Sequence, residues 1–218
     1  MTIRLAIFDC DGTLVDGQAH VWEAMKAGFA EADLPCPARH EIVRGVGLSL
    51  PVAVRRLAPG GTSEQHATAV EAYKRSFFEA RQQGRIEEPL FEGIADLLTG
   101  LHGKGWRLGV ATGKSDRGLK NCLAMHGLTD LFCTLQTADR HPSKPHPSMI
   151  EEALADALAR PENAVMIGDT TYDIEMARAA GTDAIGVAWG YHDVDELMDA
   201  GARAVAQTAQ ELEELIHG

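Results

Sequence analysis

The chain has 218 residues, 45% of them hydrophobic and 24% charged, with a formal net charge of −12 at pH 7. This composition is typical of a globular protein with one or two domains. The acidic balance, without a dense run of Lys or Arg, argues against nucleic acid and anionic membranes as partners. No apolar run approaches the roughly 20 residues of a membrane-spanning helix, so we expect no membrane partner.

The start of the chain and its cysteines predict a cytoplasmic location. The first residues, MTIRLAIFDCDG, turn acidic too early for a secretory signal peptide. The cysteines show no C-x-x-C spacing and are expected to be reduced; they are Cys10, Cys36, Cys122 and Cys133.

Short apolar segments rich in β-forming residues recur along the chain and predict buried strands. They cover residues 3–9, 106–112, 131–138, 164–169, 184–190 and 203–206. Helical patterns lie between the later strands, for example at Ile94, Leu97, Leu98 and Leu101. Alternating strands and helices predict an α/β fold, a doubly wound parallel sheet with helices on both faces.

Residues 17–88 differ from the rest, because no convincing strand occurs there. Helical patterns cover residues 19–34, 49–58 and 62–84. We therefore expect an α/β core of residues 1–16 and 89–218, with an all-helical cap domain inserted after the first strand. Ligands of open α/β sheets bind at the carboxyl ends of the strands, so the cap is expected to cover that edge.

Two acidic pairs follow predicted strands. Asp9 and Asp11 end the first strand, where pleat alternation turns Cys10 to the other face, and Asp169 ends a later strand with Asp173 four residues on. Carboxylates on one side of a strand end repel each other unless they share a cation or a proton. Mg²⁺ prefers carboxylate oxygens, so these four aspartates are the candidate metal ligands.

Other loops carry groups that suit a phosphate. Thr112 ends the second predicted strand, and the amides of Gly113 and Lys114 lead into a helix. Lys144 lies in the proline-rich turn PSKPHPSM, which holds it more firmly than a helix surface would. Arg44, beside glycines of the predicted cap, is a further candidate contact to a substrate carboxylate or phosphate.

A cation site, a hydroxyl–amide cradle and a fixed lysine are the groups that phosphoryl transfer needs, because its catalysis is mainly positioning and charge neutralisation. One carboxylate of the first pair can act as a nucleophile and form an aspartyl-phosphate. The other can protonate the leaving oxygen and then activate water.

This set of motifs resembles the haloacid dehalogenase superfamily, in its phosphatase branch with a helical C1-type cap. The resemblance rests on the stretch from Asp9 to Thr13 (DCDGT), on Thr112, on Lys144, and on Asp169 with Asp173, in the family's order. The stretches SKPHPSMIEEAL and GVAWGYHDVDELMDAGA look most like phosphoglycolate phosphatases.

The resemblance implies a role for each matching residue. Asp9 is the nucleophile, Asp11 is the acid/base, and Thr112 and Lys144 bind the phosphoryl group. Mg²⁺ is held by Asp9, Asp169 and the main-chain carbonyl of Asp11, with Asp173 beside them as a ligand or an outer carboxylate.

The expected function is therefore Mg²⁺-dependent hydrolysis of a small phosphorylated metabolite, with 2-phosphoglycolate as the best single guess, by a monomer or homodimer. A sugar phosphomutase similar to β-phosphoglucomutase has the same motifs and stays an alternative. A non-enzymatic phosphate-binding or phospho-switch protein is a second alternative.

Overall fold

The computed structural model describes residues 2–217. Within this range one sheet has the strand order β3-β2-β1-β4-β5-β6, and every neighbouring pair is parallel. The strands are β1 (Leu5–Phe8), β2 (Arg107–Thr112), β3 (Phe132–Thr137), β4 (Ala164–Gly168), β5 (Asp183–Val187) and β6 (Ala204–Ala206). All the predicted strands are present, and the doubly wound α/β fold is confirmed.

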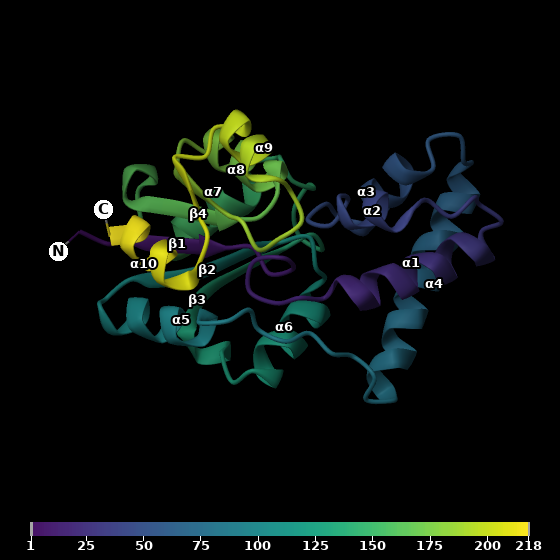
Figure 1. Cartoon of the computed structure of the whole chain (residues 1–218), viewed down its shortest axis with the longest axis horizontal. Helices are drawn as coiled ribbons and strands as arrows, with labels where there is room; N and C mark the ends of the chain where they lie inside the picture. Colours follow the sequence, from purple (N-terminus) through teal and green to yellow (C-terminus); the bar gives the residue numbers. More distant parts are fainter. Residues whose placement is uncertain (1, 218) are drawn as a thin grey trace.

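Helices cover both faces of the sheet (Figure 1). Side chains alternate along β1, so Ala6, Phe8 and Cys10 pack on one face while Leu5 and Ile7 pack on the other. The first face is covered by α5 (Ile94–Gly103), α6 (Asp116–Met125) and α10 (Ala209–His217). The second is covered by α7 (Ser148–Asp156), α8 (Thr171–Ala179) and α9 (Val194–Ala200). Short 3-10 helices precede two strands, at Thr129–Leu131 and Pro161–Asn163.

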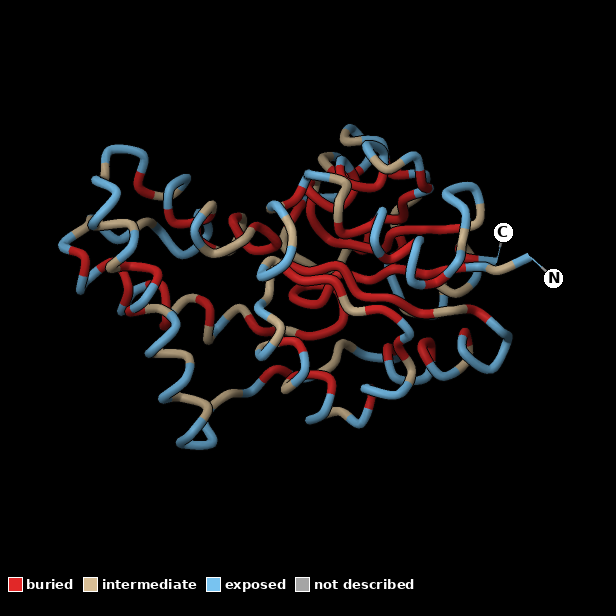
Figure 2. The backbone as a smooth tube through the Cα atoms, turned by 180° about the vertical axis from the view of Figure 1, so that it is seen from behind, coloured by how far each residue is buried: buried red, intermediate tan, exposed pale blue. Residues whose placement is uncertain are grey.

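A helical insertion follows β1 and lies beside the carboxyl ends of the strands (Figure 1). It consists of α1 (Gln18–Glu31), α2 (Arg39–Val43), α3 (Leu50–Leu57) and α4 (Ser63–Gln82). Figure 2 shows buried residues within the insertion as well as in the sheet. Phe29, Ile42 and Val54 are among its buried residues.

In the structure the insertion is built of helices, and α2 lies where the sequence patterns predict no helix. Five residues are too few to show a helical period, so no sequence pattern indicates α2. In the described range no helix combines the length and apolar character needed to cross a lipid bilayer.

Candidate active site

Three buried carboxylates, two from the ends of neighbouring strands and one from a helix, meet at the carboxyl edge of the sheet. Asp9 follows β1 and Asp169 follows β4, and these strands pair in register from Leu5 with Ala164 onwards. Asp173 lies in the first turn of α8. One carboxylate oxygen of each aspartate lies within 4.8 Å of those of the other two. The two acidic pairs of the sequence therefore do contribute to one site.

Two glycines let the loops around Asp169 approach closely. Gly12 has a φ of +86°, and a Cβ atom there would lie 2.2 Å from Asp169 Oδ2. A Cβ atom at Gly190 would lie 2.1 Å from the Asp169 Cβ. The same loops fix the carboxylate, since Thr13 Oγ1 donates to Oδ1 at 2.8 Å and the Tyr191 amide donates to Oδ2 at 3.0 Å.

Asp9 is buried with both oxygens free of hydrogen bonds from the described residues. The Lys144 ammonium lies 2.9 Å from Asp9 Oδ1 as an ion pair. Burial raises the pKa of Asp9 to about 7, against the opposing attraction of Lys144. Burial also raises the pKa of Asp169 well above its usual range, and Asp173 adds to this effect. Carboxylates in this state fit a hard divalent cation such as Mg²⁺.

Asp173 has a different environment from Asp9, because both of its oxygens are occupied. Its Oδ1 accepts a hydrogen bond from Lys144 Nζ at 2.6 Å, and its Oδ2 accepts from the Thr170 amide at 3.1 Å and from Thr170 Oγ1 at 2.7 Å. A Cβ atom at Gly168 would lie 2.3 Å from the Asp173 side chain, so this packing requires glycine. Asp173 therefore orients Lys144 and offers less to a cation than Asp9 or Asp169 does.

Lys144 is held between two carboxylates with its side chain fully buried. Burial alone disfavours the ammonium, but Asp173 and Asp9 outweigh it and raise the pKa of Lys144 above its usual range. The lysine therefore stays charged at the floor of the site. The ion pairs with Asp9 and Asp173 fix the position of its ammonium.

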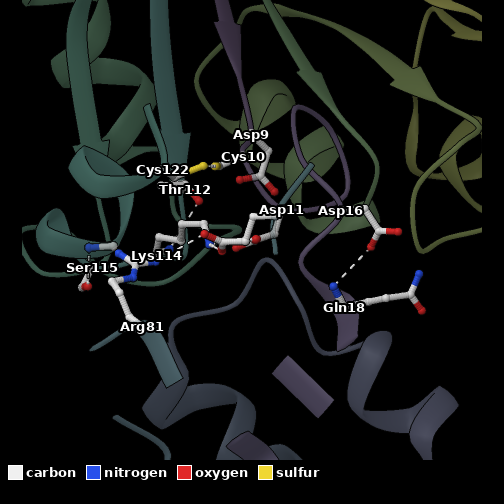
Figure 3. A network of polar contacts seen from close by, with 12 residues as sticks. Asp9, Cys10, Asp11, Asp16, Gln18, Arg81, Thr112, Lys114, Ser115 and Cys122 are labelled. Carbon is white, nitrogen blue, oxygen red and sulfur yellow. Dashed lines mark hydrogen bonds and ion pairs between the residues drawn. The ribbon is translucent and has the colours of Figure 1, made fainter. Parts of the chain in front are cut away.

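Thr112, Gly113 and Lys114, three of the predicted phosphate-binding residues, line one cavity of about 420 Å³ together with Asp9 and Asp11, whereas the buried Lys144 does not line it. Thr112 ends β2, and its Oγ1 accepts a hydrogen bond from the Lys114 amide at 3.3 Å. The Lys114 ammonium lies 2.9 Å from Asp11 Oδ1 (Figure 3). Gly113 forms the wall between them and the insertion. Hydroxyl, amide and ammonium donors therefore face the two N-terminal carboxylates.

The helical insertion forms the opposite wall of the cavity. This wall is mainly apolar; it includes Val21, Met25, Leu50, Tyr73, Phe77 and Phe78. The loop before α3 lies directly on the core, because a Cβ atom at Gly113 would come within 2.7 Å of the Gly47 carbonyl oxygen. The Ser49 amide also donates to Ser143 Oγ at 2.9 Å. The insertion thus covers the sheet edge closely in this structure.

Arg44 does not line this cavity, contrary to the expectation that it contacts the substrate. Its guanidinium instead pairs with Glu196 of α9. Its carbonyl oxygen accepts hydrogen bonds from Tyr172 Oη at 3.3 Å and from His192 Nε2 at 3.1 Å. The Thr171 amide donates to His192 Nδ1, which leaves Nε2 as the donor to Arg44. Arg44 therefore ties the insertion to the core, because the core supplies the carboxylate that the arginine needs.

Sequence reasoning missed two residues of the site. Glu88 is 1% exposed and binds Lys114 Nζ at 2.6 Å, although nothing in EEPL distinguishes it from Glu87. Thr170 orients Asp173 through both its amide and its hydroxyl. For Thr170 a signal existed, because a Thr three residues before an acidic residue is typical of a helix N-cap.

A doubly wound sheet that carries buried carboxylates, a buried lysine and a Thr-Gly-Lys loop at its carboxyl edge is typical of phosphoryl-transfer proteins. Residues 6–187 match the model of the family described as "Haloacid dehalogenase-like hydrolase", and the chain belongs to this family. The predicted family and the prediction of an enzyme are therefore confirmed.

Two curated relatives and one solved structure show how far the similarity extends. The chain is 33% identical over 210 residues to "Probable phosphatase IndB" of Dickeya dadantii, covering 95% of this chain and 91% of the relative. It is 29% identical over 195 residues to a phosphoglycolate phosphatase of Pseudomonas putida, covering 87% and 71%. A crystal structure titled "predicted phosphatase from Clostridium acetobutylicum" superposes with a TM-score of 0.88 at 26% identity, covering 100% and 99%.

Proposed function

We propose that this protein hydrolyses a small phosphorylated metabolite, a phosphate monoester, through an aspartyl-phosphate on Asp9 with Mg²⁺ as cofactor. One observation carries the proposal. Asp9 is buried and lines the cavity; its Oδ2 has no hydrogen-bond partner among the described residues, and its Oδ1 faces the Lys144 ammonium at 2.9 Å. A carboxylate in such a place is available as a nucleophile and as a ligand.

The residues around Asp9 fit the requirements of this reaction. Mg²⁺ would be held by Asp9, Asp169 and the main-chain carbonyl of Asp11, and when bound it neutralises charge on the phosphoryl group. Thr112 Oγ1 and the amide of Gly113 offer donors to the phosphoryl oxygens. The Lys144 ammonium, fixed by Asp173, adds a positive charge beside the nucleophile.

Two steps return the enzyme to its starting state. An Asp9 oxygen attacks phosphorus, the bond from phosphorus to the leaving oxygen breaks, and the Asp11 carboxylic acid gives that oxygen its proton. The Asp11 carboxylate then takes a proton from water as the water attacks phosphorus, which releases phosphate and frees Asp9. Burial raises the pKa of Asp11, which favours the protonated form that the first step needs.

The helical insertion serves as the cap in this proposal. It supplies the apolar wall of the cavity and lies against the phosphate-binding loop at Gly113. A cap in this position excludes bulk water from the aspartyl-phosphate and contacts the leaving group of the substrate. Opening of the cap would be needed for substrate to enter and for phosphate to leave.

The first substrate to test is 2-phosphoglycolate. Its support is the resemblance of the chain to phosphoglycolate phosphatases and the similarity to the Pseudomonas putida protein of that name. A sugar phosphomutase is the second candidate, because the cavity of about 420 Å³ has room for a leaving group larger than glycolate. A phosphate-binding protein without turnover would have no need for both Asp9 and Asp11.

The test is phosphate release from a panel of monoesters, with Mg²⁺ and with EDTA. The panel includes 2-phosphoglycolate, nucleotides, hexose phosphates and p-nitrophenyl phosphate. We expect Mg²⁺-dependent release that is lost in Asp9→Asn and kept in Asp130→Asn, a control on an exposed residue. Interconversion of hexose phosphate isomers without net release would favour the mutase. Absence of both reactions would contradict the proposal.

A further inference from the structure

Glu88 lies where the chain returns from the helical insertion to the core, between α4 and α5. Its side chain is 0% exposed, and its carbonyl oxygen accepts a hydrogen bond from His126 at 2.7 Å. A buried carboxylate needs cationic partners, because the loss of hydration is otherwise uncompensated. Two cations supply this compensation, and they come from opposite sides of the cavity.

The contacts form a chain of alternating charge from Arg81 of the insertion to Asp11 after β1. Arg81 of α4 lies 3.3 Å from Glu88 Oε2, and Lys114 Nζ lies 2.6 Å from Glu88 Oε1. The same Nζ lies 2.9 Å from Asp11 Oδ1. Figure 3 shows Arg81, Lys114 and Asp11 close together. The side chains of Lys114 and Asp11 are only 10% and 12% exposed, so solvent screens their attraction weakly.

Lys114 is the member of this chain that could occupy several positions. A lysine has a flexible four-carbon stem and a compact charge, so its ammonium settles where the strongest anions are. Burial disfavours the ammonium, but Asp11 and Glu88 outweigh burial and raise the pKa of Lys114 well above its usual range. Glu88 therefore keeps the ammonium beside Asp11 when the cavity is empty.

Asp11 depends on this ammonium for its orientation. Its Oδ1 accepts no well-aligned hydrogen bond from the described residues, so the ion pair with Lys114 is its polar contact. The space around it is small, since a Cβ atom at Gly17 would lie 2.9 Å from Asp11 Oδ1 and 3.5 Å from Glu88 Oε1. A displaced Lys114 would leave the Asp11 carboxyl without a polar partner to fix it.

We propose that Glu88 is a positioning residue that holds Lys114, and through it the Asp11 carboxyl, where Asp11 delivers its proton to the leaving oxygen. Arg81 joins this arrangement to the insertion, so the carboxyl is positioned when the insertion covers the cavity. The inference rests on the proposed function and deepens it. A positioning role and a purely structural role of Glu88 predict different results. Only the positioning role makes the rate loss in a Glu88 variant depend on the leaving group of the substrate.

The test compares Glu88→Gln with Glu87→Gln, its exposed neighbour. Single-turnover formation of the phosphoenzyme is measured with an alkyl phosphomonoester and with p-nitrophenyl phosphate, whose leaving group needs no proton. We expect Glu88→Gln to slow the alkyl ester roughly 10- to 100-fold and the nitrophenyl ester less than threefold. Asp11→Asn should show the same selectivity, and Glu87→Gln should match the wild type with both esters.

Thermal unfolding of each variant separates positioning from folding. If Glu88→Gln melts too early to assay, Arg81→Gln replaces it, because Arg81 is 24% exposed and its loss leaves the Glu88–Lys114 pair. In Arg81→Gln the rate of phosphoenzyme formation should fall less, about two- to fivefold, and again only with the alkyl ester. An equal fall in rate with both esters, or an unchanged rate in both variants, would overturn the inference. An inactive wild type would overturn the proposed function, and the inference with it.

Discussion

Charges at the carboxyl edge of the sheet and charges on the helical insertion have opposite environments. Lys144 has a fully buried side chain that bridges Asp9 and Asp173. On the insertion, Lys26 and Glu23 form an ion pair in which the side chains are 46% and 65% exposed. The same kind of contact therefore has a different energetic weight in the two regions.

The difference separates buried charges, which the proposed reaction uses, from charges that stay hydrated at the surface. Buried ion pairs stabilise a protein little compared with apolar packing, yet removing one partner is strongly destabilising. Exposed pairs contribute little in either case. The insertion is stabilised instead by an apolar cluster that includes Phe29, Ile42 and Val54. Buried charge concentrates at the sheet edge, where the proposed reaction needs it.

The largest effect should come from Asp9→Asn. We expect turnover to fall by at least roughly 10⁴-fold, because an amide oxygen is a poor nucleophile and cannot form the aspartyl-phosphate. The midpoint of thermal unfolding should stay the same or rise, because the change removes a carboxylate that burial disfavours while Lys144 keeps Asp173 as its partner. Phosphate release and calorimetry check these two outcomes. Measurable phosphoenzyme in the variant would show that another residue is the nucleophile.

Lys144→Met should produce the largest loss of stability. Removing the ammonium leaves Asp9 and Asp173 buried without a counterion, and the free energy of unfolding should fall by about 3–5 kcal/mol. Burial already raises the pKa of Asp9 from 3.8 to about 7, so the folded state holds more protons than the unfolded state between these values. Lys144 opposes this rise, so its removal should raise the pKa of Asp9 further. The loss of stability should therefore grow as pH rises above about 7, where the wild type releases this proton and the variant keeps it. Urea unfolding in EDTA at pH 5 and pH 8 measures this loss of stability. An equal loss at the two pH values would contradict the ion pair between Lys144 and Asp9.

Removal of Mg²⁺ should have the next largest effect. At a Mg²⁺ concentration about 100 times its dissociation constant, the ion should stabilise the wild type by about 2.7 kcal/mol. Asp169→Asn should lose most of this stabilisation. Asp173→Asn should keep more of it, because both Asp173 oxygens already accept hydrogen bonds from Lys144 and Thr170. Thermal unfolding with and without the ion tests this order, and the reverse order would make Asp173 the principal ligand.

Tyr172→Phe should weaken the contact between the insertion and the core. Tyr172 Oη accepts a hydrogen bond from Arg56 at 2.5 Å and donates one to the Arg44 carbonyl at 3.3 Å. Loss of both hydrogen bonds should favour an open position of the insertion and so lower kcat/KM severalfold. The free energy of unfolding should fall by about 1 kcal/mol. Steady-state kinetics and small-angle scattering together check it. Unchanged kinetics would mean that these contacts do not limit closure.

Lys26→Met on α1 should have the smallest effect. It repeats the change made at Lys144, but its partner Glu23 stays solvated, so stability should change by less than about 0.5 kcal/mol. Urea unfolding under the conditions used for Lys144→Met gives the comparison. A loss similar to that of Lys144→Met would remove the contrast between the two regions.

The sequence by itself determined the sheet and the positions of the strand-end residues. Apolar segments and turn residues are local signals, so the predicted strands appear in the structure, and Asp9, Thr112 and Asp169 follow from the strand ends. Parallel pairing then places these ends at one edge, whatever the details of packing. Cys10 turned into the core for the same reason, because side chains alternate along β1.

Only the tertiary structure decided which partner each charge finds. Arg44 of the insertion and Glu196 of the core meet only because the insertion packs against the core. Glu88 meets Lys114 because the connection between α4 and α5 is buried against the core. The same packing set the size of the cavity. Sequence patterns report the local period and the chemical type of a residue. They do not report which distant side chains share a buried space. Burial matters because two charges interact more strongly where water is excluded.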